Sequence, residues 1–234
     1  MDDMRQALAQ GLEELGLSLS EDIQQTLCDF GYGMVKQNEV MNLTAITQPR
    51  QVAKLHLVDS LTLLTLADLR GKSVIDVGCG AGFPGVPVQI ACPEAKVTLL
   101  DSLGKRMTWL EGFLPQLGVK PQEILTARAE EAVAQRREQY DYATSRAVAR
   151  LNILLELTAP YVKVGGTVLA MKGSAAREEL AEAKNAIAKL GLKLEKVSVF
   201  FIDGAEHSVI ALRKIAPTPK QYPRRYAKIK QAPL

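Results

Sequence analysis

Residues 73–85 read SVIDVGCGAGFPG, and this stretch decides the fold of the 234-residue chain. Its first five residues form a short apolar run typical of a buried strand. Glycines follow at once at positions 78, 80 and 82. Because glycine has no Cβ, it lets the backbone turn sharply and approach a ligand closely. The stretch therefore predicts a strand, a tight ligand-binding turn and the start of a helix.

Two acidic residues indicate which ligand the turn takes. The spacing of Gly80, Gly82 and Gly85 also fits a dinucleotide-binding loop, but a single match of this kind is weak. Asp76 would repel a pyrophosphate and attract the positively charged methionine part of S-adenosylmethionine. Asp101 ends the next apolar run, where an acid can accept hydrogen bonds from both ribose hydroxyls. We therefore predict S-adenosylmethionine as the cofactor, and a mere tight turn is the less favoured alternative.

Outward from this stretch, short apolar runs alternate with helical segments. This alternation predicts an α/β fold with a doubly wound, mostly parallel seven-stranded sheet. The last two runs are separated by only five residues, too few for a crossover helix, so they should form an antiparallel hairpin. The seven runs are Val74–Val77, Val97–Leu100, Glu123–Thr126, Asp141–Thr144, Thr167–Met171, Val197–Ile202 and Ser208–Leu212.

The chain before the sheet has the periodicity of helices. Met4, Leu8 and Leu12 recur at helical spacing, and a helix beginning at Pro49 should end near Leu69. Ser18 and Glu21 together suggest a capping box for the helix between these two. We predict a helical N-terminal extension over residues 1–70, a cofactor-binding domain over residues 71–214 and a basic tail over residues 215–234.

Charge distribution indicates an anionic partner. The formal net charge is only +3, but no acidic side chain follows Glu206. Two readings of the tail stay open, a solvated terminus or a contact with RNA phosphates helped by Tyr222 and Tyr226. The basic residues at this end of the chain are Arg213, Lys214, Lys220, Arg224, Arg225, Lys228 and Lys230.

Composition limits the remaining classes. No run of about 18 apolar residues exists, and the first residues are acidic where a secretory signal is basic, so we expect a cytosolic protein. Cys28, Cys79 and Cys92 lack metal-ligand spacing, and only two histidines accompany them. We expect reduced thiols, no metal and no membrane contact. Nothing suggests an obligate oligomer, so a monomer is expected.

Cations follow several predicted strands. Arg146 and Lys172 come after the fourth and fifth strands, and Lys105, Arg106 and Arg128 come after the second and third. A lone cation at a strand end is more often a surface residue, and Arg146 is expected to be exposed and to contribute little to stability. Together, however, the five suggest a cleft lined for phosphate, because ligands of open α/β sheets bind beyond the carboxyl ends of the strands.

Absent features narrow the methyl acceptor. No Asn/Asp-Pro-Pro-aromatic loop follows the fourth strand, which disfavours an exocyclic amine, and no cysteine follows the later strands, which disfavours carbon-5 of a pyrimidine. What remains is an acceptor that is already a nucleophile, and guanine N7 fits this description because its lone pair can attack without loss of a proton. His56, Asp59 and Ser60 lie on one short helix, so a structural hydrogen-bond cluster is favoured over a hydrolase triad.

Several strings resemble one family, the bacterial small-subunit ribosomal RNA guanine-N7 methyltransferases of the RsmG type, also called glucose-inhibited division protein B. The resemblance covers nearly the whole chain. Only the tail departs from it, because Arg224-Arg225 is followed by Tyr226-Ala227-Lys228 and not by Pro-Gly-Thr-Pro. The strings are Asn38-x-x-x-Asn42-Leu43-Thr44, His56-x-x-Asp59-Ser60, Asp76–Gly85, Leu100–Arg106, Arg128–Glu131, Ser145-Arg146-Ala147 and Lys172-Gly173.

The resemblance implies a class I methyltransferase fold, with an antiparallel last strand, acting on one guanine of small-subunit rRNA or of a subunit intermediate. It implies cofactor contacts at Gly78, Phe83, Ala129, Glu130 and Arg146, with Glu130 near the adenine. Arg146 and Lys172 are expected to be catalytic. Asp76, Gly80, Gly82 and Asp101 complete the cofactor set, and Lys105, Arg106, Arg128, Lys220, Arg224 and Arg225 form the predicted RNA-binding set. Two alternatives remain, a methyltransferase for small molecules or proteins and a non-catalytic RNA-binding module.

Overall fold

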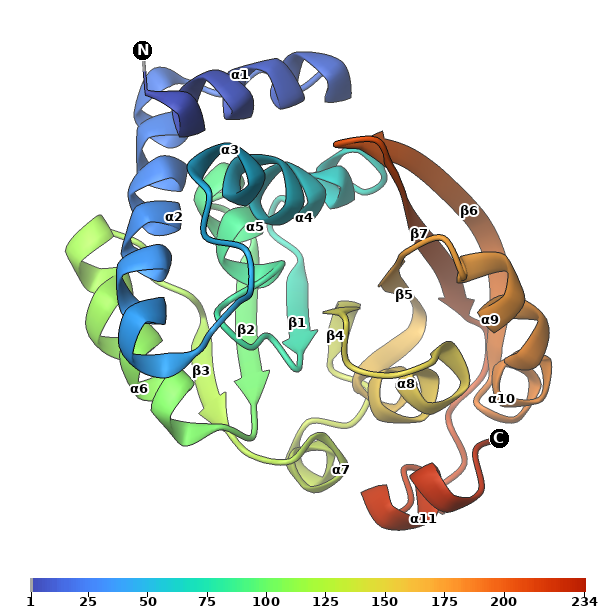
Figure 1. Cartoon of the computed structure of the whole chain (residues 1–234). Helices are drawn as coiled ribbons and strands as arrows, with labels where there is room; N and C mark the ends of the chain where they lie inside the picture. The colour runs from blue at the N-terminus through green and yellow to red at the C-terminus, as the bar shows by residue number, and fades with distance from the viewer. Residues whose placement is uncertain (1) are drawn as a thin grey trace.

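The computed structural model describes residues 2–234, so Met1, with which the predicted helical extension begins, lies outside the described residues. A seven-stranded sheet in the order β3-β2-β1-β4-β5-β7-β6 forms the centre of the molecule (Figure 1). The strands are β1 Ser73–Val77, β2 Lys96–Asp101, β3 Glu123–Thr126, β4 Tyr140–Arg146, β5 Val162–Lys172, β6 Leu192–Ile202 and β7 Ala205–Lys214.

The pairing confirms the predicted sheet. β1 runs parallel to β2 and β4, while β7 is antiparallel to both β5 and β6. The last two strands form the predicted hairpin. β6 begins at Leu192 and not at Val197, because residues 193–196 are exposed and no apolar run marks them in the sequence.

Helices cover both faces of the sheet (Figure 1). One face carries the N-terminal helices with α5 and α6, and the other carries α7 to α10 and the end of the chain. The helices and helical turns are α1 Asp3–Leu15, α2 Glu21–Met41, α3 Pro49–Val52, η1 Ala53–Val58, α4 Asp59–Leu61, η2 Thr62–Thr65, α5 Gly85–Ala91, α6 Gly104–Phe113, η3 Leu114–Leu117, α7 Ala129–Ala132, η4 Val133–Gln135, α8 Leu151–Thr158, η5 Ala159–Tyr161, α9 Ala176–Glu182, α10 Lys184–Lys189 and α11 Tyr226–Gln231.

Two predicted details of the N-terminal helices are wrong. The N-cap of α2 is Ser20, whose Oγ accepts a hydrogen bond from the Ile23 amide at 3.4 Å, so Ser18 forms no capping box. The segment that begins at Pro49 ends its helical turns at Thr65, before Leu69, and contains the π-helical turn η1. Pro49 does occupy the first turn, as predicted.

The N-terminal helices share one hydrophobic cluster with the sheet. Met4, Leu27 and Phe30 are fully buried in the same cluster as Val97 of β2. The packing at Gly33 is so close that a Cβ there would lie 2.0 Å from the Phe113 ring. These helices therefore pack into the same core as the sheet. The predicted domain boundaries at residues 70 and 214 stay predictions. Within residues 2–234 no helix is long and apolar enough to cross a membrane.

The last 20 residues fold back onto the molecule. Tyr222 and Ile229 are buried, and Glu156 on α8 is fully buried beneath Arg224. The Arg224 amide and Nε both donate to Glu156 Oε1 at 2.8 Å. As a result α11 lies below α8, close to α7 (Figure 1). The tail is thus a docked segment and not a free arm.

Candidate active site at the carboxyl ends of the strands

A cavity of about 440 Å³ lies where β1, β2 and β4 end. The turn after β1 forms its floor. Gly78 and Gly80 have φ angles of +76° and +57°, and a Cβ at Gly78 would lie 2.4 Å from Cγ2 of Val148. These positions therefore need glycine, both for the left-handed backbone and for the close approach of the loop after β4. The predicted tight turn is confirmed.

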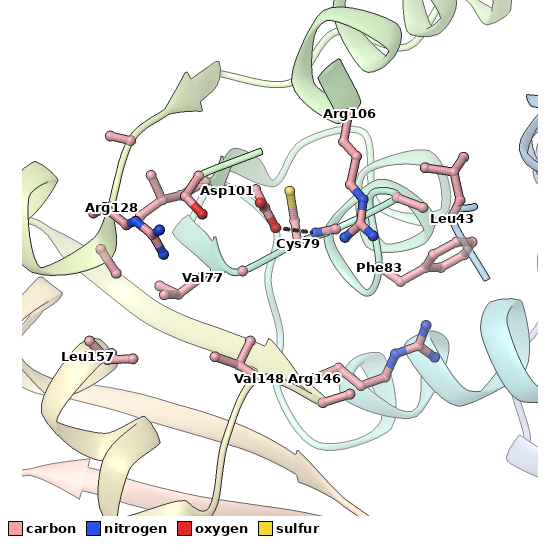
Figure 2. Close-up of a pocket in the computed structure, with 18 of the residues that line it drawn as sticks. Leu43, Val77, Cys79, Phe83, Asp101, Arg106, Arg128, Arg146, Val148 and Leu157 are labelled. Carbon is pink, nitrogen blue, oxygen red and sulfur yellow. Dashed lines mark hydrogen bonds between the residues drawn. The ribbon is translucent and has the colours of Figure 1, made fainter. Parts of the chain in front are cut away.

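Asp101 fixes the shape of this turn. Its Oδ2 accepts a hydrogen bond from the Gly80 amide at 2.9 Å, shown as a dashed line in Figure 2, and its Oδ1 accepts one from the Leu103 amide at 2.8 Å. The carboxylate also lines the cavity, as do Ala129 and Glu130. Each carboxylate oxygen can accept a second hydrogen bond, so Asp101 can still receive ligand hydroxyls.

Two other predicted cofactor residues lie beneath the cavity and do not line it. Asp76 is fully buried, and its Oδ2 accepts a hydrogen bond from the Gly85 amide at 2.7 Å. Its Oδ1 has no partner among the described residues. Gly82, at φ +98°, packs beneath the loop, where a Cβ would lie 2.7 Å from Val86. In this structure both residues shape the loop, whereas Phe83 does line the cavity.

Burial of Asp76 makes stability depend on pH. Burial raises the pKa of this carboxyl to about 7, although the Gly85 amide opposes the shift. Between about pH 4 and 7 the folded protein holds a proton that the unfolded chain releases, so the free energy of unfolding falls as pH rises. Asp76→Asn removes this penalty. We expect the melting temperature of the variant, relative to wild type, to be higher at pH 8 than at pH 5, measured by calorimetry. A difference independent of pH would contradict it.

Arg146 is buried in a network of hydrogen bonds. Its Nη1 donates to Asp59 Oδ2 at 2.8 Å and to the Leu55 carbonyl at 2.9 Å, and its Nη2 donates to His56 Nδ1 at 3.0 Å. The guanidinium also lies 5.1 Å from the centre of the Phe83 ring. With its side chain only 17% exposed, Arg146 is not the exposed strand-end cation that we predicted.

The network fixes the protonation of His56. Because arginine only donates, Nδ1 must accept, and Nε2 carries the proton that faces Thr44 Oγ1 at 2.9 Å. Burial and the neighbouring Arg146 lower the pKa of His56 to about 4. Thr44 is itself held, because its amide donates to the side chain of Asn38 at 2.8 Å. The strings around residues 38–44 and 56–60 thus position Arg146.

Asp59 lies at the centre of this cluster. Burial opposes its ionisation, but hydrogen bonds from His207 and Arg146 hold the pKa of the carboxyl below its usual range. The bond to Asp59 Oδ1, 2.9 Å long, raises the pKa of His207. Ser60 donates only to the His56 carbonyl within the helix. The predicted structural cluster is confirmed, and the triad reading is wrong.

A second cavity, of about 660 Å³, adjoins the first. His56, Arg146, Ala147 and Val148 line both cavities. Figure 2 shows the Arg146 side chain at the edge of the first. Lys172, predicted to be catalytic, lines only the second. Its Nζ lies 2.8 Å from Glu179 Oε2, and the two side chains are 7% and 13% exposed. Lys172 therefore has a carboxylate partner and is not a free cation.

Several residues of the first cavity were missed by sequence reasoning, among them Leu43, Thr44 and Tyr226. Leu43 and Thr44 come from the N-terminal region, and Tyr226 comes from α11 of the tail. The string ending at Leu43 and Thr44 was noticed without a role. Nothing in the local sequence of Tyr226 indicates a cavity residue, because its position depends on the docking of the tail through Arg224 on Glu156.

The predicted RNA-binding residues fall into two groups. Arg106 and Arg128 line the first cavity on the side opposite Arg146 (Figure 2). Arg224 is wrong as a free phosphate-binding residue, since it is bound to the buried Glu156. Lys214 is also buried, and its Nζ donates to the Ala159 carbonyl at 2.7 Å. The exposed members of the predicted set are Lys105, Arg128, Lys220 and Arg225.

The sequence predictions also concern the cysteines and the possible metal ligands. All three cysteines are free and buried. Burial raises the pKa of the Cys79 thiol well above its usual value, so this cysteine in the cofactor loop is not a ready nucleophile. In the part of the chain from residue 2 onward, no three His, Cys, Asp or Glu side chains gather as a metal site would require.

The fold and the glycine-rich cavity define the class as that of the class I methyltransferases, whose cofactor is S-adenosylmethionine. Two solved structures share the fold. A 16S rRNA (adenine(1408)-N(1))-methyltransferase from Catenulisporales acidiphilia, with its cosubstrate, has a TM-score of 0.54 at 16% identity and covers 64% of this chain and 88% of its own. A precorrin-6y C5,15-methyltransferase from Geobacter metallireducens has a TM-score of 0.53 at 13% identity and covers 75% and 92%.

Sequence comparison gives the family. The family described as rRNA small subunit methyltransferase G matches residues 23–209, and the chain belongs to it. A "Ribosomal RNA small subunit methyltransferase G" of Halalkalibacterium halodurans is 44% identical over 96% of this chain and 97% of its own. One of Alkaliphilus metalliredigens is 40% identical over 95% of both. The predicted family, fold and enzyme class are confirmed.

The first cavity fits the cofactor of this class. S-adenosylmethionine has an adenosine part and a positively charged methionine part. Asp101 can accept from ribose hydroxyls, while Val77, Leu100 and Leu157 offer apolar surface to a flat base. The missing Cβ at Gly78 allows the loop after β4 to pack closely against the turn after β1, and both loops line the cavity.

Proposed function

We propose that the enzyme transfers a methyl group from S-adenosylmethionine to N7 of a guanine in small-subunit rRNA. The observation that carries the proposal is the pair of adjoining cavities that share Arg146 in their lining, in a chain of this family. One cavity holds the cofactor, and the other lies beside it at the ends of β4 and β5. Such an arrangement suits a direct displacement between two bound molecules.

The site residues take distinct roles in this proposal. Asp101 accepts hydrogen bonds from the ribose, Glu130 and Ala129 face the adenine, and Gly78 and Gly80 allow the loop to approach the cofactor. Phe83 and Arg146 lie on the side of the first cavity that faces the second. The Arg146 guanidinium carbon lies 5.1 Å from the centre of the Phe83 ring. S-adenosylmethionine supplies, when bound, an electrophilic methyl group on its sulfonium. Arg146 orients the acceptor base, and Lys172 contacts this base from the second cavity, whose lining includes it.

Guanine N7 as acceptor agrees with the protonation of the site. Its lone pair is available without loss of a proton, so no general base is required. His56 cannot serve as one, because its Nδ1 already accepts from Arg146. Asp59 is also engaged, by Arg146 and His207. The chain's contribution is thus positioning and exclusion of water.

The partners follow from this assignment. The substrate is small-subunit rRNA, free or in a subunit intermediate, and the exposed cations Lys105, Arg128, Lys220 and Arg225 contact its phosphates. Arg106, which lines the cofactor cavity, lies beside this set. The protein acts as a monomer in the cytoplasm, without a metal ion.

Asp101→Ala tests the cofactor site. The variant loses charge-assisted hydrogen bonds to the ribose, each worth about 1.5–3 kcal/mol, and also frees the Gly80 amide. We expect the dissociation constant of S-adenosylhomocysteine, measured by calorimetric titration, to rise at least about tenfold. Wild type should bind this ligand far more tightly than NAD. Tighter binding of NAD would contradict the assignment.

The reaction itself is tested with labelled cofactor. Purified enzyme is incubated separately with small-subunit rRNA, total protein and metabolite extracts, and the methylated nucleoside is identified by mass spectrometry. We expect 7-methylguanosine in the rRNA alone. Label in protein or metabolites would favour the small-molecule or protein methyltransferase, and absence of transfer with intact RNA binding would favour the non-catalytic module.

A further inference from the structure

The second cavity has the size and position of a substrate pocket. Its volume of about 660 Å³ falls in the range of about 300–1,000 Å³ typical of small-ligand sites. It opens beside the loop after β4 and touches the first cavity through Arg146, Ala147 and Val148. A base in this cavity would therefore lie beside the cofactor cavity, next to the side chain of Arg146.

A donor and an acceptor, both largely shielded from solvent, lie next to each other in this cavity. Lys172 Nζ and Glu179 Oε2 are 2.8 Å apart, and the Leu151 amide donates to the same oxygen at 2.7 Å. Within residues 2–234 the hydrogen bond from the Leu151 amide and the ion pair with Lys172 both fall on Oε2 of this carboxylate, so Oε1 retains its capacity to accept. Apolar side chains of Ile46, Leu55 and Met171 line the same space.

We propose that this cavity receives the target guanine, extruded from its RNA strand, and that Glu179 and Lys172 read the edge of the base that carries O6, N1 and N2. The inference rests on the proposed function. If N7 faces the wall shared with the cofactor cavity, O6 and N1–H lie side by side on the adjoining edge of the ring. Lys172 then donates to O6, and Glu179 Oε1 accepts from N1–H and the 2-amino group.

The same pair rejects adenine. Adenine presents an amino donor where guanine has O6, and an acceptor where guanine has N1–H. A donor would then face Lys172 and an acceptor would face Glu179, which leaves buried polar groups without partners. This edge of the base is accessible only if the base is flipped out of an RNA helix or lies unpaired in an RNA loop. RNA-modifying enzymes commonly act on bases in one of these two states.

Inosine at the target position tests the inference. Inosine keeps N7, O6 and N1–H but lacks the 2-amino group, so only recognition of that group is removed. We compare kcat/KM for guanosine-containing and inosine-containing rRNA in wild type and Glu179→Ala, which lacks any side-chain acceptor. Wild type should prefer guanosine by about 10- to 100-fold. The preference should fall to within a few fold in the variant.

Controls separate recognition from folding. Glu178 is the neighbour of Glu179 on α9, and its exposed side chain pairs with Arg150. The Glu178→Gln variant should therefore show the same preference for guanosine over inosine as wild type. The double variant Lys172→Met with Glu179→Leu replaces both partners with apolar side chains of similar length, an exchange that buried ion pairs tolerate. It should bind S-adenosylhomocysteine normally and show no preference between the two bases.

The outcomes distinguish this inference from the proposed function. If wild type forms 7-methylguanosine but its preference is absent, or is unchanged in both Glu179 variants, the inference is overturned and the ion pair only ties β5 to α9. If wild type forms no 7-methylguanosine, the proposed function fails, and the inference falls with it.

Discussion

Arg146→Ala is expected to abolish methyl transfer and to destabilise the fold as well. The substitution leaves Asp59, whose side chain is 6% exposed, without its arginine partner. Breaking a buried ion pair costs about 3–5 kcal/mol, and we expect the lower end of this range because His207 still donates to Asp59. Single-turnover methylation should fall by at least about 100-fold, since the lining shared by the two cavities loses its fixed side chain.

Arg146→Lys and Arg150→Ala complete this experiment. Lysine keeps the charge but lacks the planar fork that reaches Asp59, His56 and the Leu55 carbonyl together, so it should rescue stability more than rate. Arg150 forms exposed ion pairs and should lose no more than about 1 kcal/mol. Urea denaturation measures stability. If Arg146→Ala has wild-type stability, Arg146 is an exposed cation in solution, as the sequence predicted. If it has the wild-type rate of methylation, Arg146 has no role in the reaction.

Much of the fold was predictable because its signals are local. Apolar runs alternating with helical segments predicted all seven strands, and the five residues between the last two runs predicted the hairpin. Asp101 followed from its place at the end of β2. What these features share is that each depends on residues close together in the chain. Strand ends such as residues 193–196 of β6 were missed because their side chains are exposed and carry no apolar signal.

The parts that could not be predicted depend on contacts between distant segments. Asp59 accepts hydrogen bonds from Arg146 and His207. These two residues lie 87 and 148 positions further along the chain. Similarly, Glu156 lies 68 positions before Arg224. A cation read from the sequence alone carries no sign of such a partner. Arg146 was therefore predicted to be exposed, Lys172 was predicted without its carboxylate partner, and Lys214 and Arg224 were counted with the basic end of the chain. Each of the four is paired in the folded chain.

The tail has a structural role that bears on the cofactor site. Tyr226 follows Arg224 by two residues and lines the first cavity, where Leu157, the neighbour of Glu156, also lies. The ion pair that holds the tail on α8 thus also places Tyr226. Removing the segment from Pro217 onward should consequently affect cofactor affinity, in contrast to a free arm, whose loss would affect RNA binding alone.

Arg224→Ala and Arg225→Ala form a matched pair that tests this role. Arg224→Ala leaves the fully buried Glu156 without its partner, so stability should fall by about 3–5 kcal/mol in urea denaturation. Binding of S-adenosylhomocysteine should weaken with it, because Tyr226 is released. Adding Glu156→Gln should recover part of the stability, since a buried neutral amide costs less than a buried charge.

Arg225 is exposed and has no such partner in the described chain, so Arg225→Ala should keep wild-type stability and cofactor affinity. If its side chain contacts a phosphate, the slope of log affinity for rRNA against log salt should fall by roughly 0.7–0.9. The opposite pattern, with Arg224→Ala stable and weak only in RNA binding, would mean that the tail leaves α8 in solution and acts as the free basic arm. Because the two arginines are adjacent in sequence and differ in burial, their contrast measures docking and not charge.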